Sequence, residues 1–375
     1  MNNRGIKLDR ADNQVLDGRY LTVFLFCSTV GLGIFLGPAI VIGAGPTYAP
    51  FSQVLGTVLT GLLVVGMLRV NALCASEGFA PWVKRIMGAY AGAVYLASFY
   101  AYFTIVVSAH ARLFAEVIHM TILTGTPVII LLAGLYLTSY YLVAQGVEAL
   151  ARFLYVVVAM EMLTYAPLSF GGLAGLTRSF LQPALPPSFR AMAEGVVAGS
   201  AAYTTGYGVL LAILPAVIER QATIYRAFQG LWLAGIFVVA AVTGTVGTFG
   251  PVVASSFAFP FLEYTETIRL GGMLSFVHRA SFVFISFWVV AVLKATAITY
   301  LGLTRVLTGS AGLSQKTALQ LTALLILGVS SLPLHLQSWL QLLATVSKIG
   351  VGYGAASLLV LLVLGRRRRS GVHHG

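Results

Sequence analysis

Ten long apolar segments, separated by shorter polar stretches, constrain this chain more than any other feature of its sequence. They lie near residues 20–43, 47–69, 87–118, 125–144, 147–170, 188–217, 224–249, 278–305, 315–333 and 338–364. A helix needs about 20 mostly apolar residues to cross the hydrocarbon core of a bilayer. Only 9% of the residues are charged, whereas soluble domains carry about 25%. The sequence therefore predicts an all-α polytopic membrane protein with about ten transmembrane helices.

The distribution of Lys and Arg predicts how these helices are oriented. Ten spans place both termini on one side, where 16 of the 23 Lys and Arg residues fall, against four on the other side and three inside spans. Because cytoplasmic loops carry the excess of Lys and Arg, we expect both termini to be cytoplasmic. We interpret the net charge of +12 as the result of basic residues that set the membrane orientation and attract anionic lipid. We expect no nucleic-acid partner.

Two of the expected spans contain residues that weaken a helix. The first carries Gly31, Gly33, Gly37 and Pro38, and the sixth carries the small and hydroxylated run 200–208, SAAYTTGYG. Glycine costs a helix about 1 kcal/mol and proline about 3 kcal/mol relative to alanine. Interrupted helices at corresponding places in two halves of a chain point to a binding site between inverted repeats. We expect repeats at about 20–170 and about 188–364.

The chemistry of such breaks favours a zwitterionic ligand. Exposed N–H groups at the start of a half-helix suit a carboxylate, and exposed carbonyls at the end of one suit an ammonium group. The candidate ligand-binding residues are Thr29, Gly31, Leu32, Gly33, Tyr102, Ser200, Tyr203, Thr204, Thr205 and Gly206. The alternative is that the glycines only let helices pack closely. A dinucleotide-binding interpretation fails, because no strand precedes the glycines.

These motifs resemble those of a known family. Gly31-Leu32-Gly33-Ile34-Phe35 followed by Pro38 resembles the first-helix motif of amino acid–polyamine–organocation (APC) transporters, which share the LeuT-type fold. The stretches 112–116 (RLFAE), 146–148 (GVE) and 259–263 (FPFLE) are similar to those of bacterial spore germination receptor B subunits (GerAB-like proteins). Members often carry a glutamate in the span-six break, where this chain has Thr205-Gly206-Tyr207.

The resemblance implies both a fold and a function. It implies a LeuT-type five-plus-five inverted repeat with broken helices 1 and 6. It also implies a germinant receptor subunit in the spore inner membrane, which binds a small nutrient, commonly an amino acid, and acts with A and C subunits. The alternative function is an autonomous, sodium-independent amino acid permease of the same superfamily.

Two ionisable residues fall deep inside expected spans. Lys294 and Glu161 lie about 12 and 14 residues from the ends of their spans that face the basic side, or roughly 18 and 21 Å. An ionisable group at the bilayer centre costs about 2.5–3.5 kcal/mol and is a functional candidate. The resemblance implies that both spans flank the first span where sodium-coupled relatives of the LeuT-type fold hold a sodium ion, so we interpret Lys294 as a substitute for that cation and Glu161 as its counter-ion. A purely structural ion pair, or a pair between Glu161 and Lys348, stays open.

The remaining sequence indicates one transmembrane domain at 20–364, between a tail at 1–19 and a basic tail at 365–375. Residues 250–276 are too polar for a span, and their Phe residues predict an outer loop with a short interfacial helix. The chain has no metalloprotease motif, Cys/His metal cluster or phosphate-binding loop. We therefore expect no enzyme activity, no catalytic residue, no cofactor and no metal.

Overall fold

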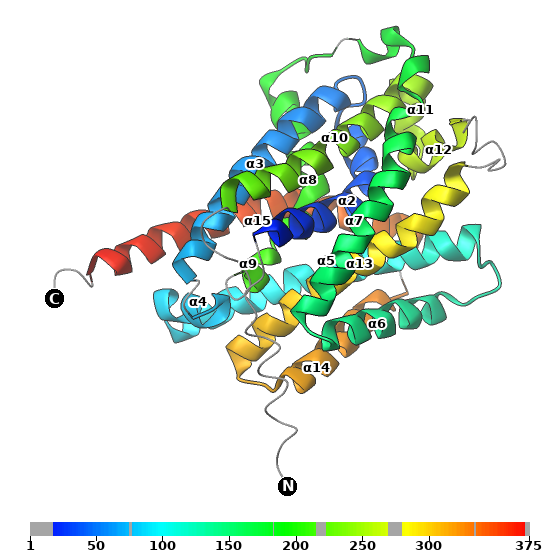
Figure 1. Ribbon diagram of the computed structural model, residues 1–375. Coiled ribbons are helices and arrows are strands. Elements are labelled where there is room, and N and C mark those ends of the chain that lie inside the picture. The colour runs from blue at the N-terminus through cyan, green and yellow to red at the C-terminus, as the bar shows by residue number, and fades with distance from the viewer. Residues whose placement is uncertain are drawn as a thin grey trace.

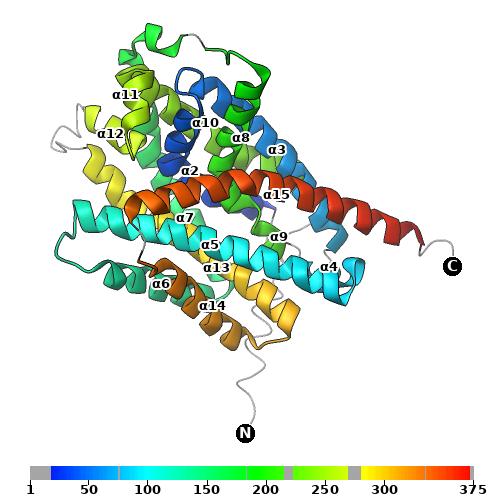
Figure 2. The ribbon, with the colours of Figure 1, turned by 180° about the vertical axis from the view of Figure 1, so that it is seen from behind.

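The computed structural model describes residues 18–74, 77–182, 184–214, 223–268, 280–333 and 335–371, and every regular element in these ranges is helical. Ten helices form the bundle in Figures 1 and 2: α2 (Arg19–Ala44), α3 (Ala49–Cys74), α5 (Ala89–Thr121), α6 (Val128–Ala144), α7 (Val147–Phe170), α8 (Phe189–Tyr207), α10 (Thr223–Phe249), α13 (Ala280–Ala311), α14 (Gln315–Ser330) and α15 (Leu336–Gly371). They coincide with the ten predicted segments, which confirms the all-α polytopic fold class.

Most of these helices are long enough and apolar enough to cross a membrane. Among the described residues six pass on length and composition, and α2 makes up to seven if its two halves count as one span. Helix α6, with 17 residues, and α14, with 16, are slightly shorter. Helix α8 has 19 residues, and its glycines, serine and threonines lower its hydropathy.

The centre of the bundle is built by α2, α3, α8 and α10. Helix α2 packs along α8 and α10, and α8 packs along α3. A Cβ atom on Gly56 of α3 would lie 2.4 Å from the backbone of Gly199 of α8, so these helices touch backbone to backbone. In Figure 2, α5 and α15 run together across one side of this centre. The small residues that weaken α8 as an isolated helix thus allow it to pack at the middle of the bundle.

Both predicted helix interruptions occur. The two parts of α2, Arg19–Val30 and Gly33–Ala44, meet at an angle of 51°, so the bend falls at residues 31–32 rather than at Pro38. Helix α8 ends at Tyr207, and the short helix α9 (Leu210–Ile213) follows it. The position of the second break is a correction, because residues 200–207 are helical and the interruption lies at Gly208 and Val209.

Short helices connect the long ones at the two ends of the bundle. Helices α11 (Pro251–Ser256) and α12 (Pro260–Thr267) lie between α10 and α13, where the sequence predicted one short helix in an outer loop. Helix α4 (Phe79–Met87) links α3 and α5 and was not predicted. It buries Phe79, Trp82, Val83 and Ile86, the spacing of one apolar helix face.

Candidate functional site

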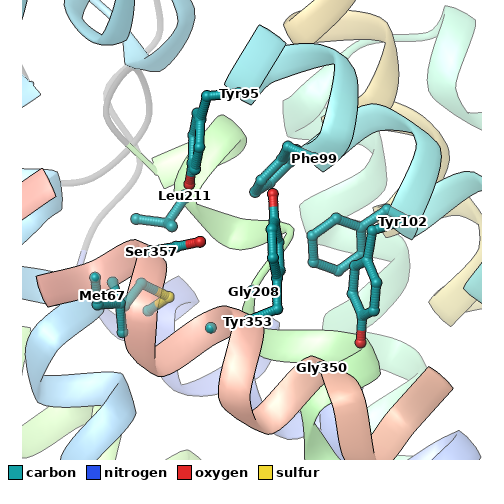
Figure 3. Close-up of a pocket in the computed structure, with 12 residues that line it drawn as sticks. Met67, Tyr95, Phe99, Tyr102, Gly208, Leu211, Gly350, Tyr353 and Ser357 are labelled. Carbon is teal, nitrogen blue, oxygen red and sulfur yellow. The ribbon is translucent and has the colours of Figure 1, made fainter. Parts of the chain in front are cut away.

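A small cavity lies beside the break between α8 and α9. Its wall comes from α3, α5, α9, α15 and Gly208 after the end of α8, and it consists of uncharged residues: Met67, Tyr95, Phe99, Tyr102, Phe103, Gly208, Leu211, Gly350, Tyr353, Gly354, Ser357 and Leu358 (Figure 3). The cavity volume is about 30 Å³, which holds about two water molecules. A ligand as large as an amino acid therefore fits only after the surrounding helices move apart.

Five of the twelve residues that line this cavity are aromatic. The Tyr102 and Tyr353 rings lie 5.4 Å apart between centroids, and the Phe99 and Phe103 rings lie 4.7 Å apart. The Tyr353 hydroxyl is 3.1 Å from the Ser98 hydroxyl, which ties α15 to α5. Such a wall suits an apolar or aromatic group on a ligand.

The sequence predicted only Tyr102 among these cavity residues. The α15 residues were missed, although the run 350–354, GVGYG, places three glycines in a span. A Cβ atom at Gly350 would lie 1.9 Å from the Tyr102 hydroxyl oxygen. Glycine at this position is therefore what allows the Tyr102 ring to reach α15, and a glycine cluster in a span was the available signal.

Ser200 and Tyr203 of α8, which the sequence predicted to bind the ligand, have side chains that face α3 rather than this cavity. The Ser200 hydroxyl lies 2.9 Å from that of Thr60. The Tyr203 hydroxyl accepts a hydrogen bond from Nε2 of Gln53 at 3.0 Å and lies 2.9 Å from the Thr57 hydroxyl. The side chains of Thr204 and Thr205 lie outside the described residues. In this conformation, the described hydroxyls of α8 hold it against α3.

The predicted glycines lie where α2 and α8 touch. A Cβ atom at Gly206 would lie 1.6 Å from the Ser28 carbonyl oxygen, and one at Gly33 would lie 3.0 Å from the Ala202 carbonyl oxygen. The Thr29 hydroxyl donates to the Leu25 carbonyl oxygen at 2.7 Å. Gly31 and Leu32 form the bend, and the Leu32 side chain is not among those described. The glycines thus serve close packing in this conformation, and their role in ligand binding stays a prediction.

A buried ion pair joins α7 to α13. The Lys294 ammonium donates a hydrogen bond to Oε2 of Glu161, and the two side chains are 0% and 1% exposed. The ammonium also lies 5.4 Å from the centroid of the Phe26 ring of α2. Lys348 lies on an exposed part of α15. Between the two alternatives that the sequence left open, the structure pairs Glu161 with Lys294.

A second ion pair lies in the C-terminal part of α5. Arg112 and Glu116 are 2.7 Å apart and about 15% exposed, and Arg112 also donates to the Ser330 carbonyl oxygen of α14 at 3.2 Å. This pair joins α5 to the end of α14. Among the described residues, no group of three or more His, Cys, Asp or Glu side chains is placed to hold a metal ion.

The family model described as spore germination protein matches residues 16–337. The chain belongs to the spore germination protein family. No curated protein sequence matches it. The family and the fold are those of transporter-like integral membrane proteins.

Solved structures place this family member in the LeuT-type fold. MhsT in complex with L-phenylalanine is 16% identical, with 91% of this chain and 88% of that chain covered and a TM-score of 0.64. A mutant of the Eremococcus coleocola manganese transporter is 14% identical (96% and 80% covered, TM-score 0.62). Mhp1, a nucleobase-cation-symport-1 family transporter in a closed conformation with bromovinylhydantoin bound, is 13% identical (90% and 76% covered, TM-score 0.61). At these identities the likeness shows the fold alone.

Proposed function

We propose that this protein is the germinant-sensing subunit of a spore germination receptor and binds a small nutrient, an amino acid. In this proposal it lies in the spore inner membrane with both termini cytoplasmic and signals to A and C subunits. The observation that carries the proposal is the uncharged aromatic cavity beside the α8–α9 break. Family membership supports the role in germination.

The cavity favours a ligand that is neutral overall. No charged side chain lines it, so a net charge would be buried without a counter-ion at a cost of several kcal/mol. The end of α8 at Tyr207 carries the partial negative charge of a helix C-terminus, which suits an ammonium group. The rings of Tyr102, Phe103 and Tyr353 suit an apolar side chain. An amino acid with such a side chain combines these features.

The small volume of the cavity supports a sensing role. A ligand shifts a conformational equilibrium only if it binds one state better than another. Here the ligand requires α5, α9 and α15, which line the cavity, to separate, so ligand occupancy and helix arrangement are coupled. That coupling would transmit binding to partner subunits.

A thermal-shift screen of the purified protein against amino acids, sugars and nucleosides tests the proposal. A ligand present at about 100 times its Kd should stabilise the protein by roughly 2.7 kcal/mol. Gly350→Leu should abolish this shift, because its side chain must displace the Tyr102 ring. Gly352→Leu is the matched control, since a Cβ atom there meets nothing within 4 Å. No shift with any amino acid, or an equal shift in both variants, would contradict the proposed site.

The alternative function is an autonomous amino acid permease, which the shared transporter fold favours. The two functions differ in flux. Reconstituted protein that accumulates a labelled amino acid without other subunits is a permease. Ligand binding without flux, together with co-purification of A- and C-type subunits, identifies a receptor subunit.

We further propose that Lys294 and Glu161 replace a bound cation at the inner half of α2. The pair is buried, and α7 and α13 both pack against α2. The Lys294 ammonium lies near Phe26, five residues before the bend. The protein should therefore respond to its ligand equally in sodium and in choline buffers. A response that requires sodium would contradict this role, while leaving the ligand site itself untouched.

A further inference from the structure

A second cavity opens between the start of α2, the middle of α7 and the start of α10. Its volume is about 290 Å³, and Arg19 and Arg226 both line it. It shares no lining residue with the aromatic cavity. No acidic side chain is among its lining residues. The two arginines give the wall of this cavity its positive charge.

The first turns of two helices hold these arginines. Arg19 is the first residue of α2, and Arg226 lies three residues after Thr223, where α10 begins. The Thr22 hydroxyl donates to the Arg226 carbonyl oxygen at 2.9 Å, which fixes the start of α10 against α2. Nη1 of Arg226 donates to Oε1 of Gln229 at 3.3 Å. The half-buried guanidinium is thus held at the cavity by its neighbours.

The α7 residues Tyr155, Val158 and Ala159 form an apolar floor of the cavity. Tyr155 and Ala159 lie 8 and 12 residues beyond Val147, where α7 begins, or about 12 and 18 Å along the helix axis. The Tyr155 ring packs edge-on against Tyr20 at 6.2 Å between centroids, as is common for tyrosine at a membrane interface. The cavity therefore joins a cationic rim to an apolar wall that runs toward the membrane interior.

We propose that this cavity binds the phosphate group of an anionic phospholipid, with an acyl chain along α7. Guanidinium groups match the oxygen geometry of phosphate and bind it through paired hydrogen bonds. The starts of α2 and α10 add the partial positive charge of helix N-termini. A phospholipid bound here joins the inner half of α2 to α7 and α10, so it stabilises the present arrangement of that half.

Native mass spectrometry of the full chain in detergent, with phosphatidylglycerol as the probe, tests this site. Arg226→Gln should lower the apparent affinity for phosphatidylglycerol about fivefold or more, the factor expected for one basic residue near a membrane surface. Lys316→Gln is the matched control. It removes one exposed positive charge that lies outside the cavity, and should lower the affinity by less than the about fivefold expected for Arg226→Gln. Equal losses in both variants would overturn the proposal, because they indicate diffuse attraction.

Two further arms separate a lipid from free phosphate. Ala159→Phe fills the floor from an exposed position, so it should weaken phosphatidylglycerol binding and leave Arg226 intact. If this variant binds the lipid as the native chain does, while inorganic phosphate competes fully, the site is a phosphate-ion site and the lipid proposal is wrong. Arg226→Lys, which keeps the charge, should bind more lipid than Arg226→Gln. It also provides a folded comparison if the glutamine variant is unstable.

Discussion

Replacement of Lys294 with methionine is the perturbation whose effect the structure bounds most closely. Methionine is similar in length but carries no charge, so the substitution leaves the Glu161 carboxylate buried without its partner. Both side chains are at most 1% exposed. Removing one member of such a pair costs about 3–5 kcal/mol, because the other charge stays buried and uncompensated. We expect Lys294→Met to destabilise the protein by that amount.

The double variant Lys294→Met/Glu161→Gln gives the decisive comparison. Replacing a buried pair by uncharged groups of similar size is often nearly neutral, so the second substitution should recover most of the lost stability. Thermal and denaturant unfolding in one detergent, followed by tryptophan fluorescence, measures all four members of the cycle. Arg152→Met is the control, since its exposed pair with Glu148 contributes only about 0.3–0.5 kcal/mol. A Lys294→Met effect below that of Arg152→Met, or no recovery in the double variant, would refute this account.

Three other substitutions test packing and pH dependence. Gly206→Val should destabilise α2–α8 packing by about 1–3 kcal/mol, whereas Gly43→Ala on α2, where a Cβ atom meets nothing within 4 Å, should not; thermal unfolding compares them. Phe35→Ala should cost about 3–5 kcal/mol by the same assay, because the fully buried ring stacks on α13. Partial burial, and then the Glu266 carboxylate, raise the pKa of Glu263 above 4.5, so the folded state holds this proton more tightly than the unfolded state. The contribution of Glu263 to stability is therefore greatest below about pH 4.5 and is lost as pH rises through the raised pKa. Amide exchange in α12 should thus be slower in Glu263→Gln than in the native chain at neutral pH. At about pH 4 the two exchange rates should be similar.

The spans were predictable because hydrophobic length is a local property of the sequence. Each backbone hydrogen bond in a membrane must be satisfied within its helix, so a run of about 20 apolar residues is sufficient to mark a span. The bend in α2 was predictable for a related reason, since Gly31 and Gly33 weaken the helix where they stand. The amphipathic α4 was missed because it is short and carries Lys84 and Arg85 in its last turn.

The position of the α8 break depended on partners far away in the chain. Ser200 and Tyr203 are the kind of residues that favour an unwound segment, but their hydroxyls meet Thr60 and Thr57 of α3, 140 and 146 residues earlier. Those contacts keep the segment helical and move the break to Gly208. The cavity could not be predicted for the same reason, because its α15 residues are far from Tyr102 in the sequence and meet it only in the folded protein.

Helix α2 contacts the Lys294–Glu161 ion pair, the start of α10 and helix α8. Its N-terminal half lies against the Lys294 ammonium through Phe26 and against the start of α10 through Thr22. Its C-terminal half is held by Phe35, whose ring lies 3.9 Å from Trp288 of α13 and 5.1 Å from Phe259 beside α12. The 51° bend separates these two sets of contacts. Each half of α2 is thus fixed to different neighbours. Helix α8 touches both halves, since Gly206 lies against Ser28 and Gly33 lies against Ala202, so movement of α8 would disturb both sets of contacts.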